Sequence, residues 1–158
     1  MSWEVGRDRI AGSIERGALE VVAPDEGVAQ RLVEDARRHV GTAMIAAAAG
    51  DLSGAYQLAY DALRKSAAAL LAVEGLRSTN RGGHVAVQDA ALAQFGDISA
   101  FRAFNRMRRA RNRFEYPDST TVGPSQQDVD DATTSAGAAH EAAAALLASG
   151  RLTPWTPD

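Results

Sequence analysis

Apolar residues recur at helical spacing through three long segments of the chain, and this pattern constrains the fold more than any other feature. In each segment the apolar positions return every three or four residues, which places them on one side of an α-helix. In the first segment these positions are Val28, Leu32, Ala36, Val40, Ala43 and Ala47. Much of the apolar content is alanine, the best helix former, and no alternating β-branched run is long enough to build a sheet. The sequence therefore predicts an all-α protein.

Capping residues and glycines mark where these helices begin and end. Asp25 is a plausible N-cap for the first long helix, which runs down to Gly50. Ser125 and Asp128 have the spacing of a capping box, and Gly150 stops the helix that follows. The expected helices span residues 25–50, 52–74, 85–95, 98–117 and 125–150. Because the link between the first two is short, they should be antiparallel neighbours, and we expect an antiparallel bundle of four to five helices.

A length of 158 residues predicts one domain with an adequate core. We expect residues 1–24 to form an N-terminal strap, with a short helix over 7–16 and an extended segment over 19–22. We expect residues 25–150 to form the bundle and residues 151–158 to be an extended or mobile tail whose Trp155 docks on the surface. Residues 75–83 are rich in turn formers and predict a loop.

Composition excludes several classes of function. Without cysteine the chain has no disulfide and no thiolate metal site, and its three histidines are far apart, so we expect no metal and no cofactor. No nucleotide-binding or nucleophile-elbow fingerprint is present. The first ten residues lack the apolar core of a signal peptide, and no apolar run approaches the length of a membrane span. We therefore expect a cytoplasmic protein with no membrane partner.

The most informative stretch is residues 98–117, ISAFRAFNRMRRARNRFEYP, which predicts one helix ending at Pro117. One side of this helix is apolar and contains Phe101, Phe104, Met107 and Phe114. A different side contains the arginines Arg102, Arg106, Arg109 and Arg113. Arg111, however, falls in the middle of the apolar side. Because an unpaired buried guanidinium is very costly, Arg111 needs a carboxylate, a carbonyl, a wet cleft or a phosphate.

A net charge of −3 is not typical of a general nucleic-acid coat protein, so contact with RNA would use a local patch. The RNA-binding candidates are Arg108 and Arg109 in the arginine-rich stretch, and Arg81 and His84 near the loop before it. On the helix over residues 52–74, Tyr56, Tyr60 and Asp61 lie close together. Two alternatives are open for these residues. In the first, Asp61 pairs with Arg64 or Lys65 on its own helix. In the second, Asp61 or one of the tyrosines faces Arg111 across the bundle.

Three pieces of the chain resemble the HEPN superfamily: AYDALRKSAAALLAVEGLR, the loop RGGH and, above all, RARNRFEYP. The resemblance covers roughly residues 25–150 and implies a bundle of four or five helices. Many members are metal-independent ribonucleases or RNA-binding modules, and their motif is an arginine, a polar residue, a short spacer and a histidine. Arg111 and Asn112 match its first two positions, whereas Tyr116 stands at the histidine position and Glu115 precedes it.

The resemblance implies an RNA-binding or metal-independent RNA-cleaving protein that is one half of a toxin–antitoxin or defence pair. It also implies a homodimer and a nucleotidyltransferase-type protein partner. The catalytic candidates are Arg111, Asn112, Tyr116 and Glu115. A tyrosine with an ordinary pKa of about 10 is a poor base near neutral pH. His84 is therefore an alternative source of the missing histidine.

The missing histidine leaves three other interpretations open, the last of which is a small-molecule enzyme that uses Tyr116 or Glu115. In the first, the chain forms a catalytically inactive helical dimer that binds a protein partner or a nucleotide. In the second, Arg111 and Asn112 only tie the bundle together, with Arg111 paired to a carboxylate such as Glu115, Asp61 or Glu74.

Overall fold

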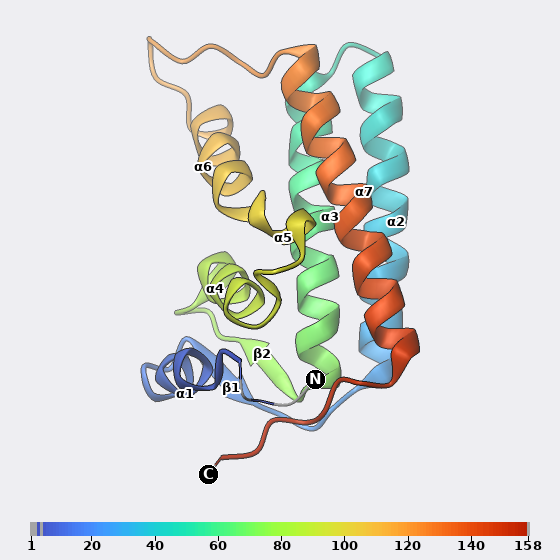
Figure 1. Ribbon diagram of the computed structural model, residues 1–158. Helices are drawn as coiled ribbons and strands as arrows, with labels where there is room; N and C mark the ends of the chain where they lie inside the picture. The colour runs from blue at the N-terminus through green and yellow to red at the C-terminus, as the bar shows by residue number, and fades with distance from the viewer. Residues whose placement is uncertain (1–2, 4, 158) are drawn as a thin grey trace.

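Three long helices form the main body of the protein. The computed structural model describes residue 3 and residues 5–157, so the expectations for residues 1, 2, 4 and 158 lie outside the described residues. Helices α2 (Glu26–Ala48), α3 (Leu52–Val73) and α7 (Gln126–Ser149) stand side by side (Figure 1). Alanines fill much of their contact surface, namely Ala36, Ala43, Ala55, Ala59, Ala62, Ala132, Ala136, Ala139 and Ala143, all of them buried. The all-α prediction is confirmed, and small side chains let the helices pack closely.

The predicted helix caps are present. The carboxylate of Asp25 accepts a hydrogen bond from the backbone N–H of Val28 (2.8 Å), and α2 begins at the next residue. The Ser125 hydroxyl accepts from the Asp128 N–H, and the Asp128 carboxylate accepts from the Ser125 N–H, which completes the capping box of α7. Gly150 follows α7 with a φ of 63°, a left-handed conformation that favours glycine.

Replacing Ser125 with alanine is expected to lower the free energy of unfolding by about 1 kcal/mol, because it leaves a donor at the start of α7 without its partner. Urea unfolding monitored by circular dichroism measures the change. The exposed residue Ser119, in the link between α6 and α7, supplies the control Ser119→Ala. Equal stabilities for the two variants would show that the capping box contributes nothing.

The N-terminal segment and the middle of the chain together cover one end of the bundle. Helix α1 (Arg7–Glu15) is followed by strand β1 (Leu19–Val21), which pairs antiparallel with β2 (Leu76–Ser78). The prediction that residues 75–83 form only a loop is therefore wrong, because backbone pairing with the N-terminal segment makes part of them a strand. Helix α4 (Gly83–Phe95) follows and begins two residues earlier than predicted. Ile10 and Leu19 are buried in the same core as the long helices.

The predicted single helix over residues 98–117 is broken into two. Helix α5 (Ser99–Arg102) is a single turn, and α6 (Phe104–Glu115) begins after Ala103. The Arg102 guanidinium donates to the backbone carbonyls of Gly96 (3.0 Å) and Asp97 (3.2 Å), which holds the short helix against the preceding loop. A second helix can then start in a new direction, alongside α3 (Figure 1).

Residues 151–157 have no regular secondary structure, but they are bound to the rest of the fold, unlike the predicted mobile tail. Trp155 is buried, and its backbone N–H donates to the carbonyl of Glu74 (2.7 Å). Its ring meets that of Trp3 edge-on, with 4.8 Å between ring centroids. The Arg7 guanidinium lies 5.4 Å from the centre of the Trp155 ring. The edge-on contact of the two tryptophans and the contact of Arg7 with Trp155 explain why the tail is held in place.

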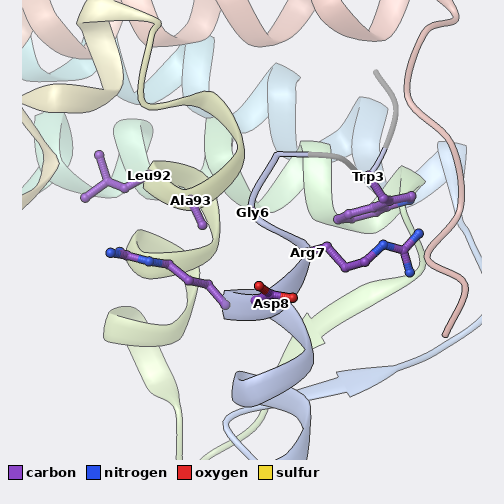
Figure 2. A pocket seen from close by; sticks show the side chains of 7 residues that line it. Trp3, Gly6, Arg7, Asp8, Leu92 and Ala93 are labelled. Carbon is purple, nitrogen blue, oxygen red and sulfur yellow. The ribbon is translucent and has the colours of Figure 1, made fainter. Parts of the chain in front are cut away.

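A pocket of about 780 Å³ lies between α1 and α4. Figure 2 shows Trp3 and Arg7 on one side of it, and Leu92 and Ala93 of α4 on the other. Gly6 has a φ of 82°, and a Cβ atom there would lie 2.6 Å from the carbonyl oxygen of Ala93. A glycine is therefore needed at this position for α1 to begin so close to α4.

In the part of the chain that the structure describes, none of the helices is both long enough and apolar enough to cross a membrane.

Candidate functional site

Helix α6 separates its arginines as the sequence predicted. Arg106, Arg109 and Arg113 are exposed, and Arg102 on the preceding turn is exposed as well. The opposite side is buried through Phe104 and Met107. The Arg111 side chain, which projects from the same side as Phe104 and Met107, is only 20% exposed. The prediction that one arginine of this helix lies against the bundle is therefore confirmed.

The Arg111 guanidinium is held by three polar partners. Its Nε donates to the side-chain oxygen of Gln57 on α3 (2.8 Å), and its Nη1 donates to the Asn112 side chain (3.3 Å). Its Nη2 forms an ion pair with Glu115 one turn further along α6. The guanidinium carbon also lies 5.9 Å from the centre of the Tyr60 ring. These contacts offset the cost of removing the charge from water.

Of the three carboxylates considered for Arg111, Glu115 is therefore its partner. Asp61 instead accepts a hydrogen bond from Arg64 (3.0 Å) and lies 3.6 Å from the Lys65 ammonium. It also lies 3.0 Å from His39 Nδ1, without the geometry of a hydrogen bond. Burial opposes ionisation of Asp61, but the hydrogen bond and charge of Arg64 outweigh it and lower the pKa of Asp61.

Tyr60 brings Arg111 together with a histidine from another helix. His84, in the first turn of α4, stacks on the Tyr60 ring with 5.8 Å between ring centroids and 26° between ring planes. Its Nδ1 lies 3.4 Å from the Tyr60 hydroxyl. Of the alternatives for what faces Arg111, a tyrosine of α3 is the one found. Residues 60, 84 and 111, far apart in sequence, meet at one place in the fold.

The pKa of His84, whose side chain is only partly shielded from water, is lowered chiefly by that partial burial and then by the positive charges of Arg64 and Arg111. Asp61 and Glu115 act in the opposite direction with smaller effect. Because an ordinary histidine already titrates below pH 7, His84 is neutral at pH 7. A neutral imidazole is able to accept a proton.

Tyr60 is buried, and burial raises the pKa of its hydroxyl although Arg64, Arg111 and Arg108 act against this. The phenol therefore remains protonated near neutral pH and serves as a hydrogen-bond partner rather than as a base.

The other predicted site residues lie at differing distances from this cluster. Arg108 donates to the buried side chain of Gln88 (2.8 Å), which links α6 to α4. Asn112 contacts Arg111, whereas Tyr116 is 73% exposed at the end of α6. Arg81 is exposed, and its guanidinium donates to a carbonyl at the end of α1. Arg109 is exposed on the arginine side of α6.

Gln57 is a functional candidate that was not predicted from the sequence. It lies one helical turn before Tyr60 on α3, so both face α6. That spacing was a usable signal, because any group packed on Tyr60 would also reach Gln57. No cluster of three acidic or histidine side chains that could hold a metal occurs within residues 3 and 5–157.

Comparison of the chain with protein-family models, with curated proteins and with solved structures found no match. The resemblance to the HEPN superfamily therefore stays a prediction.

Proposed function

We propose that the protein binds RNA and cleaves it without a metal ion, as the resemblance to HEPN proteins implies. The observation that carries this proposal is the meeting of Arg111 and a neutral His84 on the ring of Tyr60. Metal-independent cleavage of RNA needs a cation for the phosphate and a base for the ribose 2′-hydroxyl, and these two side chains are of those types.

Arg111 is the proposed phosphate ligand. Its guanidinium is held in place by Gln57 and remains partly exposed. A phosphate would compete with Glu115 for the outer edge of the guanidinium, which forms forked hydrogen bonds with either oxyanion. The exposed side of α6, with Arg106, Arg109 and Arg113, supplies positive charge that attracts the rest of an RNA strand.

His84 is the proposed base. When Nδ1 carries the proton and faces the Tyr60 hydroxyl, Nε2 is left to accept the 2′-hydroxyl proton. The 2′-oxygen then attacks phosphorus, and the bond from phosphorus to the 5′-oxygen breaks. The departing oxygen takes a proton from water, which leaves a 2′,3′-cyclic phosphate and a 5′-hydroxyl. Arg111 stabilises the negative charge that builds on the phosphate during this step.

A second function is favoured by a different observation. The Arg111 guanidinium already binds Gln57, Asn112 and Glu115. Such contacts are expected of an arginine whose only role is to hold α6 against α3. The chain would then be a catalytically inactive helical dimer that binds a protein partner or a nucleotide.

RNA decay tests the first function. Purified protein is incubated with end-labelled single-stranded RNA in the presence of a chelator, and cleavage and binding are measured separately. We expect wild-type protein to produce cyclic phosphate ends and Arg111→Ala to reduce cleavage at least tenfold. His84→Ala should lower cleavage about 100-fold and leave RNA affinity within a fewfold of wild type, as loss of a base does.

Arg37→Ala is the matched control, since it removes an exposed arginine of α2 that pairs only with Glu34 among the described residues. Glu115→Gln gives a further test, because freeing Arg111 should tighten RNA binding if a phosphate replaces that carboxylate. If wild type and Arg111→Ala neither bind nor cleave RNA, the proposal fails. The second function would be supported if wild-type protein did not cleave RNA but captured one protein in a pull-down that does not depend on RNA. Multiple-turnover cleavage of RNA would exclude the second function.

In this proposal the protein acts in the cytoplasm as a homodimer. Its protein partner is of the nucleotidyltransferase type, and the two belong to a toxin–antitoxin or defence system. Light scattering during size-exclusion chromatography measures the mass in solution. A monomer at micromolar concentration would remove the dimer from the proposal.

A further inference from the structure

A second groove lies on the other side of α6, between that helix and α7 and beside the link that joins them. Its volume is about 520 Å³, which is within the usual range for sites that bind small molecules. It shares no lining residue with the cluster around Arg111, although Arg106 and Arg113 of its wall also belong to the side of α6 that is proposed to attract RNA.

The floor of this groove is aromatic and contains one hydroxyl that lacks a protein partner. Tyr56 and Phe114 meet edge-on with 5.1 Å between ring centroids, and buried Met107 lies beside them. Tyr56 is only 5% exposed, and its hydroxyl makes no hydrogen bond to a described residue. Because this hydroxyl opens onto the groove and has no protein partner, it is free to bond to water or to a ligand there.

The two walls of the groove have opposite charge. Arg106 and Arg113 line it from α6, two helical turns apart, and Asp128 and Asp131 line it from α7. Within the described residues no ion pair joins these walls. Each carboxylate has one local hydrogen bond, from the Ser125 N–H to Asp128 and from the Gln127 side chain to Asp131, and keeps other acceptor sites.

The same charges surround the Tyr56 hydroxyl. Burial is the main cause that raises the pKa of Tyr56, while Arg106 and Arg113 lower it and Asp128 raises it further. The hydroxyl therefore keeps its proton near neutral pH and is available as a donor between the two walls.

We propose that this groove binds a small zwitterion with an apolar body, of the class of free amino acids with aromatic or large aliphatic side chains. The ligand carboxylate binds between Arg106 and Arg113 and accepts a hydrogen bond from Tyr56. Its ammonium group binds Asp131 and Asp128. Its side chain packs on the rings of Tyr56 and Phe114. A polyanion is disfavoured by the aspartates and a polycation by the arginines, so only a ligand with both charges matches both walls.

Isothermal titration of the full chain with L-phenylalanine and L-leucine tests the ligand class. Phenethylamine lacks the carboxylate and 3-phenylpropionate lacks the ammonium group, so each matches one wall only. We expect L-phenylalanine or L-leucine to bind at least tenfold more tightly than either single-charge analogue. Equal binding of the analogues, or no heat from either amino acid up to about 10 mM, would overturn the proposal.

Variants locate the binding on the groove. Arg106→Gln and Asp131→Asn are each expected to weaken amino-acid binding at least tenfold, and Tyr56→Phe to weaken it severalfold. Arg109→Gln and Asp130→Asn are matched controls, because these residues are exposed on the same two helices but do not line the groove. Circular dichroism checks that each variant is folded. Equal losses in the controls would contradict the assigned site, whatever the outcome of the RNA experiments.

Discussion

Replacing Phe104 with alanine is expected to lower the free energy of unfolding by about 3–5 kcal/mol. Phe104 is fully buried at the start of α6, and its ring meets that of Tyr60 edge-on with 6.0 Å between centroids. The smaller side chain removes apolar burial and leaves a cavity beneath the helix that carries Arg111. We therefore expect loss of the cluster around Tyr60 together with loss of stability.

Urea unfolding at constant pH measures this effect for Phe104→Ala. Val122→Ala is the control, because Val122 is 84% exposed in the link between α6 and α7 and should change stability by less than about 0.5 kcal/mol. A loss below about 1 kcal/mol for Phe104→Ala would mean that α6 is not packed on α3 as described.

The stability of the protein is expected to fall between about pH 5 and pH 8 because of Glu74. This side chain is 3% exposed, and burial raises its pKa from 4.5 to about 8, although a hydrogen bond from Gln94 (3.0 Å) acts against the rise. The folded state therefore holds a proton that the unfolded chain releases. The stabilisation is complete below pH 4.5, decreases by up to about 1.4 kcal/mol per pH unit above it, and is lost above pH 8.

Glu74→Gln removes this dependence, since glutamine stays neutral and still accepts the hydrogen bond from Gln94. We expect the variant and wild type to be about equally stable near pH 5 and the variant to be more stable by several kcal/mol near pH 8. Urea unfolding across this pH range gives both curves. Glu34→Gln, on the exposed side of α2, should keep the wild-type slope. Parallel curves for Glu74→Gln and wild type would show that Glu74 does not hold its proton.

Much of the fold was predictable because its signals are local. The cap at Asp25, the capping box at Ser125 and the left-handed Gly150 each involve residues within one helical turn. Strand β2 was missed because its pairing with Leu19–Val21 joins segments more than fifty residues apart. The break at Ala103 was missed for a similar reason, since the Arg102 contacts that hold α5 come from the preceding loop.

The candidate site divides in the same way. Helical periodicity alone separates the exposed arginines of α6 from Arg111, because the angle between successive residues is set by the backbone. The same periodicity cannot show that Glu115, rather than Asp61 or Glu74, is the carboxylate that Arg111 binds. That choice depends on how α6 lies against α3.

The amino-acid sequence by itself determined where the long helices begin and end, which faces are apolar, and that one arginine of α6 faces the bundle. Only the tertiary structure decided that His84, Tyr60 and Arg111 meet, and that opposite charges face each other across the groove between α6 and α7. The physical reason is that hydrogen bonding and periodicity within a helix depend on near neighbours in the chain. Contacts between residues of different helices depend on how the side chains of those helices fill a shared core.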